Sequence, residues 1–310
     1  MTRTCGKGDA RLDSSGTSLA IVGAGRVGRA LGRQLRLAGW PITAVVTRSE
    51  ASARRAARHI GAGRSFGGLT RLLLAADVVL IAVPDDSVTG LARRLAEMGG
   101  EEWKGKVILH TSGALDSRAL GALERVGAST GSLHPLQSFS ARVAPSLEGV
   151  WMVIEGHAKA VRVARQIARD LGGLPLHIRV DDKKAYHAAG VFSAAHVLTL
   201  IETGTRILAS VGFSRRQAGP ALLHLARQVL VNFERYGPGI AWSGPVARGD
   251  FGTVAGHVRA LRNYPREYGE AYAAVHRLGA RVLSRRPGAV LAKLENALLG
   301  KLIKAADTEK

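Results

Sequence analysis

Residues 19–28 read LAIVGAGRVG, in which an apolar run leads directly into a Gly-x-Gly-x-x-Gly motif. A helix-like spacing of apolar residues follows over residues 30–37. In such a strand–turn–helix unit the first glycine permits the turn, the second admits a pyrophosphate, and the third lets the helix pack on the strand. The free N–H groups of the helix N-terminus then favour the negative charge. We predict a dinucleotide site, rather than an ordinary glycine-rich turn, formed by Gly23, Gly25, Arg26, Val27 and Gly28.

The rest of the chain divides into an alternating part and a helical part. Apolar runs at 19–22, 42–46, 78–83, 107–111, 128–133 and 151–155 alternate with helical patterns, and a last short run follows at 174–180. This alternation is typical of a parallel sheet with crossover helices. Helical patterns then occupy 182–211, 215–236, 251–262, 265–285 and 288–305. We predict a disordered lead-in over 1–16, an α/β Rossmann domain with a doubly wound, mainly parallel sheet over 17–180, and an all-α domain over 181–310.

The charge of the chain raises the question of nucleic-acid binding. Its 44 Lys and Arg outnumber 24 Asp and Glu, which gives a formal net charge of +20. The basic residues are scattered, however, and the aromatic residues (5%) are not interleaved with them as a stacking platform requires. We expect an Arg-rich solvated surface that attracts anionic ligands, and no specific nucleic-acid partner.

The composition also bears on location and on metals. No run approaches the ~18 consecutive apolar residues of a membrane span, and residues 1–16 lack the apolar centre of a secretory signal. The single cysteine, Cys5, allows neither a disulfide framework nor a thiolate metal site. We expect a cytoplasmic protein without a membrane or metal site.

The end of the second expected strand indicates which dinucleotide is bound. NAD-binding domains usually carry an acidic residue there, which holds the ribose 2′-hydroxyl. This chain has Thr47, Arg48 and Ser49 instead. A guanidinium flanked by two hydroxyls suits a 2′-phosphate, so we predict NADP(H). The alternative is that Arg48 is merely exposed.

Three further strand ends supply candidate ligands of the nicotinamide and the substrate. Val83 and Pro84 end an apolar strand whose carboxyl end should border the ligand crevice, so they are expected to line the nicotinamide site. Ser112 lies in HTSGAL (110–115), and His134 lies in GSLHPLQ (131–137). We expect Ser112 to hydrogen-bond the substrate or the nicotinamide ribose and His134 to bind an anionic substrate group. Turn or cap roles are equally compatible with both residues.

The first helix of the second domain carries the candidate proton donor. Asp182 is a suitable N-cap, and Lys183 and His187 are four residues apart and share one helix face. A lysine at a low-dielectric crevice can protonate a developing alkoxide or stabilise its charge, and a histidine can orient the carbonyl. A solvated lysine and a core histidine are the alternative.

A constrained turn over residues 243–253 supplies the remaining candidates. Arg248 could pair in bidentate fashion with a substrate carboxylate. Asp250 is a second candidate ligand, although it would also serve as the N-cap of the following helix.

Taken together, these motifs resemble one protein family over about residues 17–300. They are the glycine motif of 23–28, residues 76–85, HTSGAL (110–115), GSLHPLQ (131–137), DKKAYH (182–187) and SGPVARGD (243–250). The family comprises Rossmann-like NAD(P)-dependent oxidoreductases with a helical C-terminal domain long of unknown function. They are relatives of 6-phosphogluconate dehydrogenase and pyrroline-carboxylate reductase, and some members are alternative ketopantoate reductases. The related hydroxyacid dehydrogenases carry Lys-x-x-x-Asn where this chain has Lys183 and His187, and Ala195 replaces an asparagine that is frequent further along.

The resemblance implies NADPH-dependent reduction of a small 2-oxo acid, with 2-dehydropantoate, reduced to pantoate, as the best single substrate. Lys183 would then donate the proton, His187 and Ser112 would orient the substrate, and Arg248 or His134 would bind its carboxylate. Reduction of a C=N bond and a non-catalytic NADP-binding redox sensor are the alternatives. The family also implies a homodimer formed through the helical domain.

Overall fold

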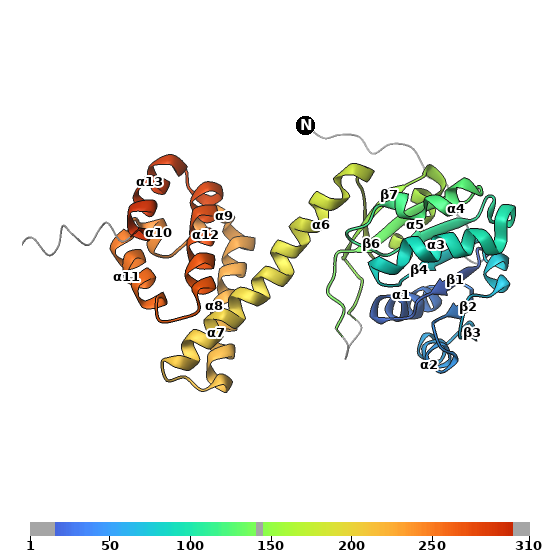
Figure 1. The fold of residues 1–310 in the computed structure, drawn as a ribbon, viewed down its shortest axis with the longest axis horizontal. Helices are drawn as coiled ribbons and strands as arrows, with labels where there is room; N and C mark the ends of the chain where they lie inside the picture. Colours follow the sequence, from blue (N-terminus) through green and yellow to red (C-terminus); the bar gives the residue numbers. More distant parts are fainter. Residues whose placement is uncertain (1–15, 141–144, 300–310) are drawn as a thin grey trace, which may run out of the picture. The chain divides into compact units, whose positions relative to one another are not determined.

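Eight strands form a single sheet in the computed structural model, which describes residues 16–140 and 145–299 (Figure 1). The spatial order is β3-β2-β1-β4-β5-β6-β7-β8. The strands are β1 (Leu19–Val22), β2 (Ile42–Val46), β3 (Arg64–Phe66), β4 (Val78–Ile81), β5 (Val107–His110), β6 (Ser129–Pro135), β7 (Trp151–Gly156) and β8 (Leu174–His177). All neighbouring strands pair in parallel except β6 and β7, which are antiparallel. The predicted Rossmann fold and mainly parallel sheet are confirmed.

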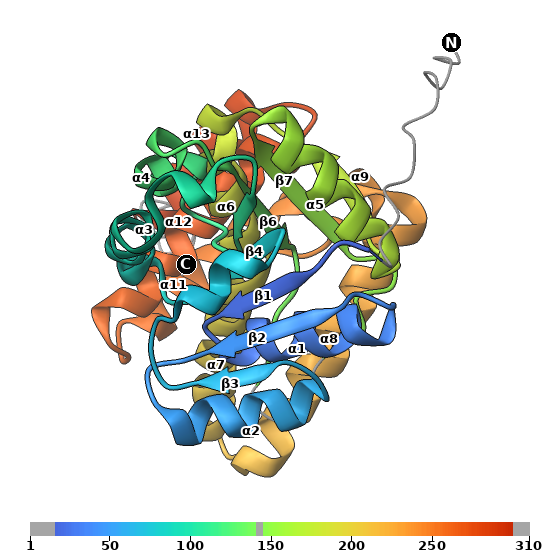
Figure 2. The same ribbon diagram turned by 90° about the vertical axis from the view of Figure 1, so that its right-hand side faces the viewer.

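Helices cover both faces of this sheet, which is why β1, β4 and β5 are buried along their whole length. One apolar core packs α1 (Arg26–Leu37), α2 (Glu50–Ile60) and α5 (Ala158–Asp170) against the sheet. The other core lies beneath α3 (Asp85–Gly99) and α4 (Gly121–Arg125). Figure 2 shows β1, β2 and β3 side by side with their arrowheads at the same edge.

The turn from β1 into α1 depends on glycine at two positions. Gly23 has φ +88°, and a Cβ there would lie 2.5 Å from the Ala82 carbonyl oxygen. A Cβ on Gly28 would lie 2.1 Å from the Gly23 carbonyl oxygen. Gly25 has open space around its Cα and caps α1, so it lets a ligand approach the first N–H groups of the helix.

The strands differ from the sequence-based expectation mainly at their ends. β1 and β2 have the expected bounds, and β4, β5 and β8 end earlier, because the chain leaves the sheet to form turns. The strand β3 was not predicted, since three residues at the sheet edge carry too little alternation to distinguish them from a loop. The expected lead-in, apart from Gly16, and Cys5 lie outside the described residues.

A continuous helical run follows the sheet. It begins after the 3-10 turn η4 (Val180–Asp182) and contains α6 (Lys183–Val191), the π-helical turn Phe192–His196 and α7 (Val197–Ser210). Asp182 makes no side-chain cap, contrary to expectation, because it belongs to the preceding 3-10 turn. The chain divides into the units Met1–Ala194 and Ala195–Lys310, so α6 groups with the sheet instead of starting the helical unit at residue 181.

Among its described residues, the second unit contains helices joined by turns and no strand. It contains α7, α8 (Arg215–Tyr236), α9 (Pro238–Ala241), α10 (Pro245–Arg248), α11 (Phe251–Leu261), α12 (Arg266–Leu283) and α13 (Pro287–Leu298). The last expected helix, 288–305, extends past the described residues. A small apolar core joins α11, α12 and α13, with Val254 and Leu294 fully buried. By contrast, α7 and α8 each bury a single residue, Thr205 and Ala218.

The exposed surface of α7 and α8 is rich in large apolar side chains. The most exposed are Leu198, Leu225, Leu230, Phe233 and Tyr236, each with more than half of its surface accessible. Large exposed apolar patches are typical of interaction sites, so these two helices are a candidate interface. Within residues 16–140 and 145–299, no helix combines the length and apolarity needed to cross a membrane.

Candidate functional site

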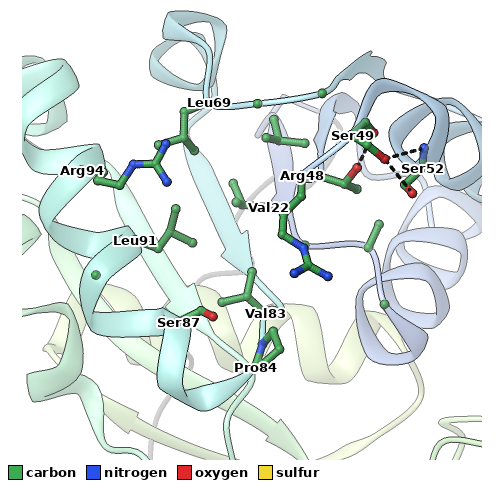
Figure 3. A pocket seen from close by; sticks show the side chains of 18 residues that line it. Val22, Arg48, Ser49, Ser52, Leu69, Val83, Pro84, Ser87, Leu91 and Arg94 are labelled. Carbon is green, nitrogen blue, oxygen red and sulfur yellow. Dashed lines mark hydrogen bonds between the residues drawn. The ribbon is translucent and has the colours of Figure 1, made fainter.

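A cavity of about 1200 Å³ opens at the carboxyl ends of β1, β2 and β4 (Figure 3). Its wall includes most of the predicted cofactor residues, namely Gly23, Gly25, Thr47, Arg48, Ser49, Val83 and Pro84. Gly28 contributes to close packing behind the turn instead. The side chains of Arg26 and Val27 are not part of the wall. The prediction for these two residues concerns the free N–H groups at the start of α1, and it stays a prediction. The Arg26 Nη1 donates to the Phe139 carbonyl oxygen at 3.2 Å, and Val27 packs into the core beneath α1.

The end of β2 presents a cation and hydroxyls to this cavity. Arg48 is exposed and extends into the cavity in Figure 3. The Thr47 hydroxyl donates to the Ser49 carbonyl oxygen at 2.9 Å, and the Ser49 hydroxyl donates to Ser52 Oγ at 3.0 Å. Ser49 also caps α2, because its Oγ accepts a hydrogen bond from the Ser52 N–H. The side chains that meet here suit an oxyanion.

The first acidic residue after Arg48 in the sequence, Glu50, does not line the cavity. Glu50 follows Ser49, but its carboxylate accepts hydrogen bonds from the Gly67 N–H at 2.8 Å and the Ser65 hydroxyl at 3.3 Å. Glu50 is not part of the cavity wall. Among the described residues that line the cavity there is no carboxylate, whereas an NAD-binding domain usually holds the ribose 2′-hydroxyl with one.

Several residues of the wall were not expected from the sequence, among them Ser52 and Arg94. Ser52 lies three residues after the helix cap, a position that capping rules could have identified. Arg94 lies on α3 and extends from the side opposite Arg48 in Figure 3. No sequence signal marks Arg94, because only the packing of α3 against the sheet brings it to the cavity.

A second cluster is buried in the sheet face beneath α3 and α4. His110, Ser132 and Glu155 stand side by side on β5, β6 and β7, since His110 pairs with Ser132 and Ser132 with Glu155. All three side chains are fully buried. Lys183, the first residue of α6, is equally buried and donates from Nζ to Ser132 Oγ at 2.6 Å. This bond ties α6 to the sheet.

Burial lowers the pKa values of two members of this cluster, Lys183 and His110. It lowers the pKa of Lys183 to about 8, and the charge of Glu155 opposes that shift more than Asp116 or Asp85 does. Burial and then the charge of Lys183 lower the pKa of His110 to about 4. His110 is neutral near pH 7 and bonded on both sides, with Nδ1 accepting from the Ser112 N–H and Nε2 lying 3.1 Å from the Asp116 carbonyl oxygen.

His134, Tyr186 and His187 meet at the carboxyl end of β6. His134 Nδ1 lies 2.6 Å from the Tyr186 hydroxyl oxygen, and the rings of His134 and His187 are 6.3 Å apart. A Cβ on Gly113 would lie 2.6 Å from His187 Cδ2 and 2.7 Å from His134 Nε2, so glycine allows the two histidines to approach this loop. Sequence reasoning missed Tyr186, although it lies within the DKKAYH motif.

The protonation state of His134 limits the ways in which it can bind an anionic substrate group. Burial, followed by the charge of Lys183, lowers its pKa to about 3, and burial raises the pKa of Tyr186 to about 12. Both groups are therefore neutral at physiological pH, and the phenol can donate to Nδ1 while Nε2–H points elsewhere. His134 can bind an anionic group only as a neutral N–H donor.

The remaining predicted residues have local partners or none. The Ser112 hydroxyl oxygen accepts from the Ala114 and Leu115 N–H groups and so forms a turn. In the helical unit, Asp250 caps α11 by accepting from the Thr253 N–H and hydroxyl. The side chain of Arg248, at the end of α10, is exposed and makes no hydrogen bond or ion pair within the described residues. No group of three or more potential metal ligands occurs in the part of the chain that the structure describes.

Comparison with known domains matches both halves of the chain. Residues 3–135 match the Rossmann-like domain, and residues 150–278 match a domain of unknown function, DUF2520. The chain is a Rossmann-like domain followed by a DUF2520 domain. The family resemblance drawn from the motifs is confirmed. No curated protein matches the chain.

Solved structures share this architecture at low sequence identity. A Thermotoga maritima protein is 22% identical with a TM-score of 0.66, and the match covers 90% of this chain and 98% of that one. A proposed NADP oxidoreductase from Bacteroides fragilis is 20% identical with a TM-score of 0.66, covering 85% and 97%. Pyrroline carboxylate reductase from Plasmodium falciparum, solved with NADP bound, is 15% identical with a TM-score of 0.52, covering 92% and 98%. At these identities the likeness shows the fold.

The low pKa of His134 makes a prediction about acid stability. The unfolded chain binds a proton at His134 near pH 6.5, whereas the folded chain does so only near pH 3. The free energy of unfolding should therefore fall as pH decreases through this window, and His134→Gln should make that fall shallower. Urea unfolding at pH 5 and pH 7.5 measures the difference, with His59→Gln on the exposed face of α2 as the control. An unchanged pH slope in His134→Gln would contradict the burial argument.

Proposed function

We propose that the chain is an NADPH-dependent reductase of a small 2-oxo acid, with 2-dehydropantoate as the best single substrate. The observation that supports this cofactor is that Arg48 extends into the cavity, with Thr47 and Ser49 beside it in the sequence and in the wall, while the Glu50 carboxylate is hydrogen-bonded elsewhere. The NADP bound in the Plasmodium falciparum reductase supports the same cofactor class.

The cavity is large enough for a dinucleotide, and its wall offers suitable groups for each part of that cofactor. Its volume of about 1200 Å³ exceeds the roughly 300–1,000 Å³ of ordinary small-molecule pockets. Gly25 and the N-terminus of α1 would hold the pyrophosphate, Arg48 with Thr47 and Ser49 the 2′-phosphate, and Val83 with Pro84 the nicotinamide side. Bound NADPH would supply the hydride.

The residues of the chain would supply the proton and the orientation. Reduction of C=O to CH–OH adds a hydride to carbon and a proton to oxygen. Lys183, with its pKa lowered to about 8, can give the proton from Nζ and remain a donor near neutral pH. Its bond to Ser132 must open for this, because Lys183 is fully buried in the present conformation. We assign orientation to His187 and Ser112, and the substrate carboxylate to Arg248 or to the neutral His134 Nε2–H.

A second reading is reduction of a C=N bond. Imine reductases share the fold, including the enzyme of Streptomyces aurantiacus, which is 15% identical with a TM-score of 0.62 over 89% of this chain and 99% of that one. An imine substrate that is already protonated needs no general acid. The two reactions therefore differ in how much they depend on Lys183.

The decisive assay is NADPH oxidation with 2-dehydropantoate, other 2-oxo acids and cyclic imines. With a 2-oxo acid, Lys183→Met should lower kcat by about 100-fold or more, the usual contribution of a general acid, while NADPH binding is retained. Lys184→Met, which alters the exposed neighbour, is the control. Full activity of Lys183→Met on a 2-oxo acid would refute the donor role. Activity on imines alone would favour the second reading, and NADPH binding without turnover would favour a redox sensor.

We also propose a homodimer formed through α7 and α8. These two helices expose several leucines and aromatic residues, and a second copy would offer the same surface in a self-complementary contact. Light scattering should give twice the chain mass of 32.7 kDa. Leu225→Glu with Leu230→Glu should give monomers, whereas Leu37→Glu on the exposed side of α1 should not. A wild-type protein that is monomeric at micromolar concentration would refute the proposal.

A further inference from the structure

Glu155 on β7 places a carboxyl group in the buried interior of the sheet unit. Among residues 16–140 and 145–299 it is the only buried carboxylate, and Lys183 is the only buried amine or guanidinium. Neither carboxylate oxygen of Glu155 has a hydrogen-bond partner. An ionised carboxylate removed from water costs several kcal/mol unless another charge or hydrogen bonds compensate it. If Glu155 is ionised, the fold must supply a compensating charge.

The geometry of the sheet leaves one candidate for that charge. Glu155 lies directly across the antiparallel β6–β7 pair from Ser132, and paired residues present their side chains on the same face. Ser132 Oγ accepts the hydrogen bond from Lys183 Nζ. The other basic groups facing this space, His110 on β5 and His134 on β6, have pKa values of about 4 and about 3 and are neutral near pH 7.

The remaining groups around Lys183 do not replace Glu155. Asp116 precedes η3 (Ser117–Leu120) and forms a 2.8 Å ion pair with Arg118. Asp85 begins α3, and its effect on the pKa of Lys183 is smaller than that of Glu155. The centroid of the Tyr186 ring lies 5.9 Å from Lys183 Nζ, and the phenol of Tyr186 is neutral near pH 7.

We propose that Glu155 is the internal counter-charge of Lys183, a positioning residue that keeps Nζ in its ammonium form at Ser132. The ammonium bonds to the Ser132 hydroxyl instead of the carboxylate, so attraction across the serine stabilises the charge without a direct contact that would have to break. The Lys183 amine is thus already protonated before a substrate binds. This part of the inference rests on the proposed function, whereas the pairing of the two charges does not.

The test measures the protonation of Lys183 without turnover. Full-length protein labelled with ¹³C at lysine Cε is titrated by NMR, with Lys183→Met used to assign the signal. E155Q should lower the pKa of Lys183 by about one unit or more, a tenfold smaller ammonium-to-amine ratio at pH 8. E155D should retain most of the wild-type pKa, and E124Q, which removes an exposed carboxylate paired with His157, should leave it unchanged. An E155Q titration equal to that of the wild type would overturn the proposal.

Two further readouts keep the result interpretable. If E155Q alone is too unstable to titrate, Lys183→Met is compared with Lys183→Met/E155Q. Removing both charges should give a more stable protein than leaving Glu155 unpaired, and a less stable double variant would overturn the proposal. The pH profile of kcat is then recorded with the best substrate. A shifted Lys183 pKa without any turnover would refute the proposed reductase and leave the charge pair established.

Discussion

The contact between Gly28 and Gly23 fixes the geometry of the Rossmann half. The helix α1 starts where β1 ends, so close that a Cβ on Gly28 would lie 2.1 Å from the Gly23 carbonyl oxygen. Gly23 in turn sits against Ala82, at the end of β4. With side chains at these two positions, the N-terminus of α1 could not stand over the carboxyl edge of the sheet. The free N–H groups, the end of β2 with Arg48, and the Val83-Pro84 wall therefore border one cavity.

The two halves of the sheet carry different chemistry. Over β1, β2 and β4 the carboxyl edge is open, and it offers arginine, hydroxyl and N–H groups to an anionic ligand. Across β5, β6 and β7 the polar groups are enclosed, and the Lys183–Ser132 bond joins α6 to them. The helix α6 belongs to the sheet unit, where this bond is one of its contacts, although its sequence reads as part of the helical domain. The π-helical turn at Phe192–His196 then spans the division between the two units.

The sequence predicted those features that follow from local rules. The glycine spacing, the apolar runs and the absence of an acid after β2 are each read from a few adjacent residues, and the cavity wall contains Gly23, Gly25 and Arg48 as expected. Arg94 and Glu155 could not be found in this way, because a helix packing angle and an antiparallel register bring them into place. The capping tendency of Asp250 was visible in the sequence, and the structure shows the cap. The sequence left two environments open for Lys183, a low-dielectric crevice and a solvated first turn, and only the structure shows that the side chain is buried.

Recognition of a 2′-phosphate by Arg48 is tested most directly by the binding of NADPH and NADH to the full-length chain. The wild type should bind NADPH roughly tenfold or more tightly than NADH, the effect of one charge-assisted phosphate contact. Arg48→Asp should abolish or invert this preference, and Arg58→Asp, on α2 but outside the cavity wall, should keep it. Equal affinity of the wild type for the two dinucleotides, or an NADPH preference that survives Arg48→Asp, would contradict the account.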